Sequence, residues 1–470
     1  MVNISARRTG RRSRLVGAAS VLVLAVAVPL IALAASAGAG KHRLAAADQF
    51  LKATYFPIKL RASSDPQEIR YDISCLPPDG DAEGSGLCDA GGTVYLRSSS
   101  NLSASVPLQL DANAQVGRYV AAVPSSIWTA PWFTYYAVIR DNTSGRTITL
   151  PQGGSAAPQF SFAMGSSAIG LGDHSFGVVR HAHARVASAS WGSGPGQVGI
   201  EDGIDMPTGA ASFDVDSAGD VFILDEANSR MLEFTGGSAL APIGLPGLTG
   251  VRADLRISDT AGTAYVLETS NATLPRPQLR AYTLQGSPLG SSLVADAVAA
   301  QVRVAGSTAY VSEYPSSMWA PVLQNNGRTA VDGISQLARA NPGAPAQNGN
   351  VVVLSMGDEI RIGSYTPTGT TYQVSTARIT SSTPVADVQL AQALPSSRVL
   401  VVFSVYTDTQ HEYEAVIVDS SGSLVDQFAL PAADWAQSMP LSRFRLVGSS
   451  LYELGSTEDG VFVDRYDLGV

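Results

Sequence analysis

One pattern recurs through the second half of the chain and limits what that half can fold into. An apolar strand is followed by a polar turn, often with glycine, and then by a second strand that carries an aromatic residue. The clearest copies are residues 213–224, 255–267, 302–311 and 444–454, and weaker copies begin near Val351 and Val388. The aromatic residues Phe222, Tyr265 and Tyr310 lie 43 and 45 residues apart. Units of about 40–50 residues with four short strands each are typical of a β-propeller, and six of them fit residues 186–470.

Residues 57–165 carry a different strand pattern. Segments 68–75, 93–97 and 106–110 alternate between apolar and polar residues. The stretches 132–140 and 146–150 flank a turn rich in Asp, Asn and Gly, which predicts a hairpin. About seven strands of this kind in roughly 105 residues favour an immunoglobulin-like or fibronectin-like sandwich. The expected fold is therefore all-β, a small sandwich followed by a six-bladed propeller.

The N-terminus has the layout of an export signal. Residues 1–14 contain five arginines and no acidic residue, and residues 15–37 form an uncharged apolar run long enough to cross a bilayer. Small residues follow at 35–38, as a cleavage site requires, but Lys41 and Arg43 come directly after them, which favours an uncleaved anchor over a cleaved signal peptide. In both cases the basic flank keeps the N-terminus in the cytoplasm, and a stalk of residues 38–56 leads to an extracytoplasmic body, either anchored in the cell membrane or secreted.

Cys75 and Cys88 are the two cysteines of the chain, and they flank a turn-rich loop. In an oxidising compartment such a pair is expected to form a loop-closing disulfide. A metal or redox role would need a CxxC spacing or a second pair of cysteines, and the sequence has neither.

Charge and hydrophobicity exclude several classes of protein. Beyond residue 43 the chain has 24 basic and 40 acidic residues, so it should repel nucleic acid. A hydrophobic share of 45% excludes a disordered chain, and one apolar run excludes a protein with several membrane spans. The expected partner is a protein or an envelope glycan.

Residues 191–234 contain a motif that resembles an NHL repeat. After a glycine-rich turn, the residues that carry this resemblance are Pro207, Asp216, Gly219, Asp225, Asn228 and Arg230. The next unit keeps Asp259, Gly262 and Tyr265 but lacks the close Asn-x-Arg spacing. The resemblance implies a six-bladed propeller in a bacterial, extracytoplasmic protein and implies little about activity.

Two polar clusters in this unit have a structural and a functional interpretation. Asp225, Asn228 and Arg230 are expected to satisfy one another and backbone groups at a blade edge, with ligand binding as the alternative. Asp214, Asp216 and Asp220 resemble a calcium loop, but Ala218 stands where another oxygen ligand is needed, so a hairpin turn is favoured. Segment 194–199 fits GxGxxG but opens no helix, which excludes a dinucleotide site.

Histidines and tryptophans supply two further hypotheses. His181 and His183, with Asp173 and His174 nearby, are a candidate set of metal ligands, although alternating polar residues more often form a solvated face. Trp128 and Trp132 are candidates for stacking on sugar rings, although aromatic residues in a small sandwich usually pack in its core.

The sequence therefore predicts an extracytoplasmic binding or scaffold protein without catalytic residues or a cofactor. No GxSxG, HExxH or P-loop motif is present to favour a nucleophile-elbow hydrolase, a zincin or a nucleotide-binding protein. The alternative is a propeller enzyme of the lactonase or hydrolase type with a metal at the channel mouth.

Overall fold

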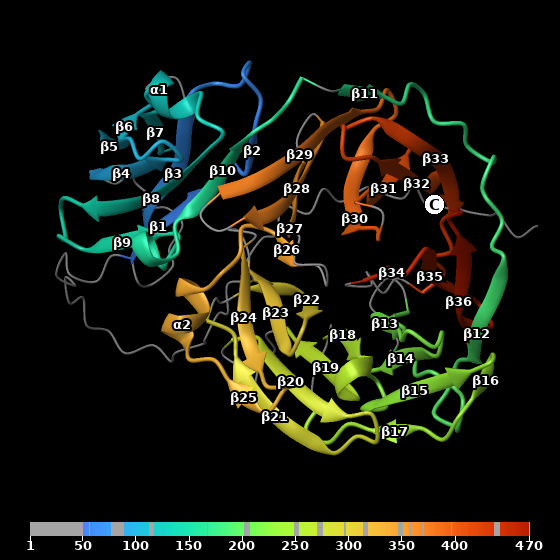
Figure 1. The fold of residues 1–470 in the computed structure, drawn as a ribbon. Helices are drawn as coiled ribbons and strands as arrows, with labels where there is room; N and C mark the ends of the chain where they lie inside the picture. Colours follow the sequence, from blue (N-terminus) through green and yellow to red (C-terminus); the bar gives the residue numbers. More distant parts are fainter. Residues whose placement is uncertain are drawn as a thin grey trace, which may run out of the picture.

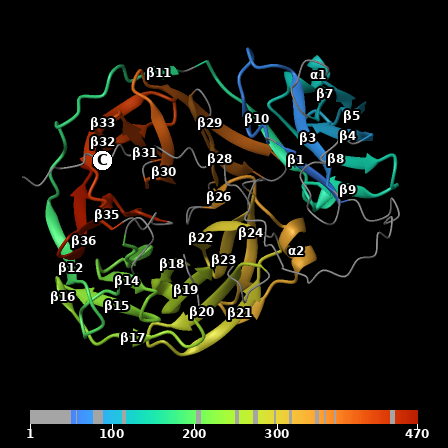
Figure 2. The same ribbon diagram turned by 180° about the vertical axis from the view of Figure 1, so that it is seen from behind.

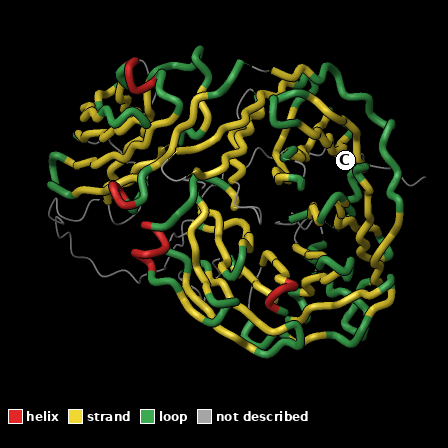
Figure 3. Tube along the Cα trace, in the orientation of Figure 1, coloured by secondary structure: helices red, strands yellow, loops and turns green. Residues whose placement is uncertain are grey.

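The computed structural model describes most of the chain beyond residue 49. The described residues are 50–55, 57–76, 89–111, 117–166, 168–201, 207–248, 253–269, 276–295, 298–313, 318–345, 351–356, 359–368, 371–395, 397–436 and 442–469. Nearly all regular structure in them is β-strand (Figure 3). The helical segments among them are α1 Ser125–Trp128, α2 Gly333–Ala338 and the 3₁₀ turns η3 Gly154–Ala156 and η4 Asp259–Ala261.

Two sheets pack face to face in the N-terminal part. Their strands are β1 Phe50–Tyr55, β2 Leu60–Arg61, β3 Glu68–Leu76, β4 Ala90–Ser98, β5 Ser103–Pro107, β6 Gln109–Leu110, β7 Arg118–Ala122, β8 Trp132–Asp141, β9 Thr147–Leu150 and β10 Gln159–Ala163. The first sheet has the order β1-β3-β7-β6, and the second has the order β2-β10-β8-β4-β5 with β9 beside β8. One shared core, which includes Tyr71, Ile73, Phe133 and Ile139, lies between the two sheets.

The predicted hairpin at residues 132–150 is confirmed. β8 pairs antiparallel with β9, and alternate β8 side chains from Phe133 to Ile139 are buried, as an amphipathic strand requires. Asp141 ends β8 and accepts hydrogen bonds from the amides of Thr143 (2.9 Å) and Ser144 (3.2 Å). Gly145 completes the turn at φ +73°, a conformation that favours glycine.

Six further sheets lie around a ring beside the sandwich (Figures 1 and 2). Ring sheets 1 to 3 contain β13 Ser212–Val215, β14 Val221–Asp225, β15 Arg230–Thr235, β16 Ser238–Ala239 and β17 Ile243–Gly244; β18 Ala253–Ser258, β19 Thr263–Glu268, β20 Gln278–Thr283 and β21 Pro288–Leu293; and β22 Ala299–Ala305, β23 Thr308–Glu313, β24 Trp319–Gln324 and β25 Thr329–Ala330.

Ring sheets 4 to 6 are antiparallel, apart from the parallel pairing of β11 with β29 in sheet 4. Sheet 4 contains β26 Ala344–Pro345, β27 Val351–Met356, β28 Ile360–Thr368, β29 Thr371–Thr380 and β11 Ala168–Gly170; sheet 5 contains β30 Val385–Ala393, β31 Val399–Tyr406, β32 His411–Val418 and β33 Leu424–Pro431; and sheet 6 contains β34 Phe444–Val447, β35 Ser450–Thr457, β36 Gly460–Asp467 and β12 Ala184–Ser190.

The strand pairs predicted from the recurring pattern are confirmed. Each of the four clearest copies forms an antiparallel pair, namely β13 with β14, β18 with β19, β22 with β23, and β34 with β35. Neighbouring sheets then share apolar cores. Phe222 and Leu224 of sheet 1 pack with Leu255 and Val266 of sheet 2, for example. This arrangement of sheets is a β-propeller fold.

The ring is closed by a segment from its N-terminal side, the strap (residues 168–190). β11 pairs parallel with β29 in sheet 4, Val179 forms a parallel bridge with Ala429 of sheet 5, and β12 pairs antiparallel with β36 in sheet 6. The strap therefore passes along the outer edges of the last three sheets in turn (Figure 1). The pairing of residues near 186–191 with the final strand is the closure expected from the sequence.

Charged side chains hold the strap to these edges. Arg180 pairs with Asp426 at 3.0 Å and lies over the Phe428 ring at 3.5 Å. Arg185 pairs with Asp464 at 2.9 Å, and its guanidinium lies 3.7 Å from the centre of the Phe462 ring. Each arginine thus adds an ion pair and a cation–π contact to the backbone pairing.

The sandwich docks on ring sheet 4. Phe162 stacks on Tyr365 with 3.8 Å between ring centres, and Leu60 completes this small core. Arg361 donates to Asp65 (Nη2 to Oδ1, 2.8 Å) and to the carbonyl of Leu60 (3.1 Å). The contact combines an apolar core with an ion pair at its rim.

Two expected boundaries differ in the structure. The stalk of residues 38–56 overlaps β1, which pairs with β3 across its whole length and belongs to the sandwich. The ring takes up strands from residue 168 rather than 186, because β11 joins sheet 4. The apolar run 15–37 lies outside the described residues, and none of the helices within them is long and apolar enough to span a membrane.

Closure through β12 and β36 predicts a strong effect of Gly460. A Cβ atom at this position would lie 2.0 Å from the carbonyl oxygen of Ala189 in β12. We expect Gly460→Val to lower the free energy of unfolding by about 3 kcal/mol, because the clash separates the two strands. Chemical denaturation of the purified chain measures this, with Gly244→Ala as the control, since Gly244 has open space around it. An unchanged unfolding midpoint in Gly460→Val would contradict closure by this pair.

Candidate functional site

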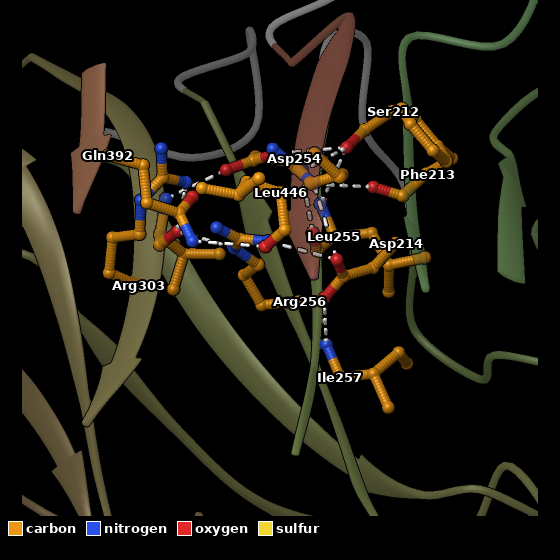
Figure 4. Close-up of polar contacts among 12 residues, drawn as sticks. Ser212, Phe213, Asp214, Asp254, Leu255, Arg256, Ile257, Arg303, Gln392 and Leu446 are labelled. Atoms are coloured by element: carbon orange, nitrogen blue, oxygen red, sulfur yellow. Dashed lines mark hydrogen bonds and ion pairs between the residues drawn. The ribbon is translucent and has the colours of Figure 1, made fainter. Parts of the chain in front are cut away.

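The first strands of the ring sheets bring polar residues together around the ring centre. We define the central cluster as Ser212, Asp214, Asp254, Arg256, Arg303 and Arg445. They come from β13, β18, β22 and β34, where polar and apolar residues alternate. The apolar residues between them, such as Phe213, Leu255 and Val302, pack in the cores between sheets. Figure 4 shows most of this cluster with its hydrogen bonds.

Asp254 is the hub of the central cluster. Its Oδ1 accepts hydrogen bonds from Ser212 Oγ (2.9 Å) and Arg445 Nη2 (2.7 Å), and its Oδ2 accepts one from the amide of Val302 (2.8 Å). The side chain is completely buried. One carboxylate on β18 therefore contacts β13, β22 and β34.

Arg445 and Asp214 extend the network. Arg445 donates to the carbonyls of Phe213 (2.8 Å) and Leu255 (2.9 Å), and it is fully buried. Asp214 accepts from Arg256 Nη1 (2.9 Å) and from the amide of Ile257 (2.7 Å). Arg445 Nη1 has no hydrogen-bond partner within the described part of the chain.

The cluster contains an excess of one positive charge. Three guanidinium groups, Arg256, Arg303 and Arg445, face two carboxylates, Asp214 and Asp254. Arg303 donates to the carbonyl of Val302 (3.3 Å) but forms no ion pair with a carboxylate among residues 50–469 as described. Burial, then repulsion by Arg256 and Arg445, lowers the pKa of Arg303 well below its ordinary value.

An uncompensated buried cation is costly, and an anion is the group that relieves it. Guanidinium groups bind carboxylate and phosphate with directed, charge-assisted hydrogen bonds. Gln392 borders the cluster, and its buried Oε1 also has no partner among the residues described (Figure 4). The arrangement is suited to holding an anionic group.

The NHL-like cluster serves internal contacts. Asp225 is buried and accepts from Asn228 Nδ2 (2.8 Å), Arg230 Nε (2.7 Å) and the amide of Gly199 (2.9 Å). Arg230 also donates to the carbonyl of Gln197 (2.8 Å). The three side chains tie the glycine-rich turn to ring sheet 1. Pro207 lies next to Thr208, which forms a bridge with Glu201.

The candidate calcium loop is divided between two places. Asp214 turns into the central cluster, whereas Asp216 closes the β13–β14 turn by accepting from the amides of Ala218 (2.9 Å) and Asp220 (2.8 Å). Gly219 completes that turn at φ +90°. Burial, followed by the charges of Asp220 and Asp259, raises the pKa of Asp216.

The histidine set is not brought together as a metal site. His174 is buried between Glu414, which contacts its Nδ1, and Glu412, whose Oε2 lies 2.8 Å from its Nε2. His183 Nδ1 accepts from the amide of Asp467 (3.1 Å), and His181 is exposed. No group of three or more His, Cys, Asp or Glu side chains in the described ranges is placed to hold a metal ion.

The sandwich tryptophans differ in exposure. Trp128 is buried in the core and contacts Phe133, so it is not available to stack on a sugar. Trp132 is partly exposed and packs against Phe160. Cys75 is buried at the end of β3, and Cys88 lies outside the described residues, so their pairing stays a prediction.

Sequence reasoning missed most of the central cluster. Asp254, Arg256, Arg303 and Arg445 belong to no local motif, and only Asp214 was singled out, in another role. The available signal was a charged residue at alternate positions of otherwise apolar strands, as in Asp-Leu-Arg at 254–256 and Arg-Leu-Val at 445–447.

The hub predicts a large and pH-dependent effect of Asp254. Burial alone would raise its pKa, but the charges of Arg445 and Arg256 lower it overall. The stabilisation is thus present above the ordinary carboxyl pKa of about 4 and is lost as the pH falls through the lower folded-state value. At pH 7 we expect Asp254→Ala to cost about 3–5 kcal/mol, because Arg445 loses its buried partner.

Denaturation at pH 7 and at acidic pH measures this effect of Asp254. The matched control is Asp426→Ala, which removes a partly exposed ion pair and should cost no more than about 1 kcal/mol. Equal losses in the two variants would contradict the role of Asp254 as the hub.

No family model matches the chain, so the NHL resemblance has no support from that comparison, and no curated protein matches either. Similar solved structures include β-propeller proteins. A protein of unknown function from Bacteroides caccae is 15% identical over 54% of this chain and 92% of its own, with a TM-score of 0.34. Virginiamycin B lyase from Staphylococcus aureus is 11% identical over 56% and 85%, with a TM-score of 0.33. A 6-phosphogluconolactonase-like protein from Bacteroides fragilis is 10% identical over 81% and 96%, with a TM-score of 0.31. Because these scores are low, the fold rests on the chain's own sheet order.

Proposed function

We propose that this chain is an extracytoplasmic recognition protein whose propeller holds an anionic ligand at the central cluster. The observation that carries the proposal is the uncompensated positive charge in this cluster. Among the described residues, Arg303 forms no ion pair with a carboxylate. An anionic group of the ligand supplies the missing charge. The central cluster binds and does not catalyse.

The frame in this proposal is a six-bladed propeller preceded by an immunoglobulin-like or fibronectin-like sandwich. Six sheets of four or five strands, closed by the strap, support the first part. Two antiparallel sheets that share one core support the second. A rigid frame of this kind suits recognition, because little conformational entropy is lost when a ligand binds.

The ligand class follows from the chemistry of the cluster. Arg303 and Nη1 of Arg445, which has no partner among the described residues, are hydrogen-bond donors, and both suit a carboxylate or phosphate group. An acidic envelope glycan or an acidic protein segment presents such groups outside the cytoplasm. Nucleic acid does not fit, because the body of the chain carries an excess of acidic residues.

A lactonase or hydrolase with a metal at the channel mouth is the alternative. It would need carboxylate or imidazole side chains that converge on the ring centre. In the central cluster the two carboxylates are engaged by arginines, so no observation there favours a metal.

Anion binding is tested by thermal unfolding of the purified chain with inorganic phosphate, glucuronate or uncharged glucose. We expect phosphate or glucuronate, but not glucose, to stabilise the fold, by about 2.7 kcal/mol at a concentration of 100 Kd. Arg303→Gln should abolish the effect, and Arg339→Gln, which removes an exposed arginine, should keep it. Equal stabilisation of both variants, or none by either anion, would overturn the proposal.

Location outside the cytoplasm is tested through the cysteines. If the body is exported to an oxidising compartment, Cys75 and Cys88 should be joined, and closing a loop of this length should stabilise the sandwich by about 3 kcal/mol. A thiol count on the denatured, full-length chain from its native host should find no free thiol. Two free thiols per chain would contradict this placement.

A further inference from the structure

Three side chains with complementary chemistry meet between ring sheets 5 and 6. Ser404 lies near the end of β31, His411 begins β32, and Asp434 follows the end of β33. Ser404 Oγ is 2.8 Å from His411 Nε2, and Asp434 Oδ2 is 3.3 Å from His411 Nδ1. None of the three belongs to the central cluster.

The order of these contacts defines the proton positions. A carboxylate only accepts hydrogen bonds, so Nδ1 of a neutral His411 carries the proton and donates it to Asp434. Nε2 then has a free lone pair, which accepts the hydroxyl proton of Ser404. This is the arrangement in which a histidine acts as general base for a serine, and it is recognised by geometry rather than by sequence order.

The carboxylate is itself held in place. Arg443 Nη2 forms an ion pair with Asp434 Oδ1, and Tyr413 Oη lies 3.5 Å from Oδ2. Burial opposes ionisation of Asp434, but the hydrogen bond from His411 and the charge of Arg443 lower its pKa overall. The Tyr413 ring meets the His411 ring edge to face at 5.0 Å and limits its rotation.

A second titratable group nearby is strongly perturbed. Glu453 is buried in β35, its Oε2 accepts from Tyr466 (3.0 Å), and its Oε1 has no partner among the described residues. Burial raises its pKa to about 8, against the opposing charge of Arg443. The charge of Asp434 also raises this pKa, so Glu453 lies near the carboxylate that contacts His411. Strongly perturbed titratable groups cluster at functional sites.

Exposure indicates how a substrate would approach. The side chains of His411 and Asp434 are 40% and 30% exposed, whereas Ser404 is only 6% exposed. Trp435 follows Asp434 directly, is 39% exposed, and lies 6.2 Å from Trp191 between ring centres. A recessed nucleophile of this kind suits an ester with a short acyl group.

We propose that Ser404, His411 and Asp434 form a hydrolytic site for short-chain carboxylic esters, separate from the central cluster. Ser404 Oγ attacks the carbonyl carbon while His411 Nε2 takes the hydroxyl proton. The bond between carbonyl carbon and alcohol oxygen breaks, and His411 returns the proton to the departing alcohol. Water, deprotonated by His411, then attacks the acyl carbon on Ser404. The bond between this carbon and Oγ breaks, His411 returns the proton to Oγ, and the carboxylic acid leaves.

The test uses the full-length chain with p-nitrophenyl acetate and with a fluorophosphonate probe. We expect hydrolysis of the ester and one probe per chain, located on Ser404 by mass spectrometry. Ser404→Ala should abolish both reactions, and His411→Ala should slow both by a factor of about 10²–10⁴.

Two control variants separate chemistry from folding. Ser423→Ala and His183→Ala change an exposed serine and an exposed histidine outside the proposed site, and both should label at the wild-type rate. All variants are compared only where their unfolding midpoints match that of the wild type, and Ser404→Cys serves if Ser404→Ala does not fold. A folded wild-type chain that is not labelled, a label on another residue, or a wild-type rate in folded His411→Ala would overturn the proposal.

Discussion

The buried ion pair between Arg445 and Asp254 joins the last ring sheet to the second. Arg445 lies in the last sheet and Asp254 in the second, and the same carboxylate also accepts from Ser212 in the first sheet and from the amide of Val302 in the third. Such a pair offsets its desolvation only when its remaining groups are satisfied by good hydrogen bonds. The network around Asp254 meets that condition, because both carboxylate oxygens accept hydrogen bonds. Arg445 does not meet it fully, because its Nη1 has no hydrogen-bond partner among the described residues. The ring is therefore joined at its centre by charge and at its rim by the backbone pairing of the strap.

The parts of the fold that depend on local patterns could be predicted. Alternation within 132–150 and the pattern at 213–224 determine hairpins, because both strands and the turn are adjacent in sequence. The regular spacing of such hairpins indicated stacked sheets. The strap could be predicted only in part. Within it, only β12 was recognised as strand-like and as a partner for the final strand, β36. β11 has three residues and pairs with a strand some 210 residues further on, which no local pattern reports.

The candidate sites were the least predictable part, and the reason is geometric. The strongest motif, Asp225 with Asn228 and Arg230, has a recognisable spacing because its residues bind one another and a nearby turn. Residues that form a site at a ring centre come from different sheets. They are therefore separated in the sequence by about one repeat or several, and such a spacing matches no short motif that indicates a chemical function. Ser404, His411 and Asp434 show the same limit at closer range, since a strand, a turn and a loop separate them.

The strap determines the order in which parts of the ring can fold during synthesis. Its residues are made some 200 to 280 residues before the strands that they pair with, so sheet 4 acquires its outer strand only after β29 has been made, and sheet 6 only after β36 has been made. Contacts of such long sequence separation fold slowly, because a large loop must close before any pairing energy is gained. The ring of this chain therefore stays open until β36 has been made and can pair with β12.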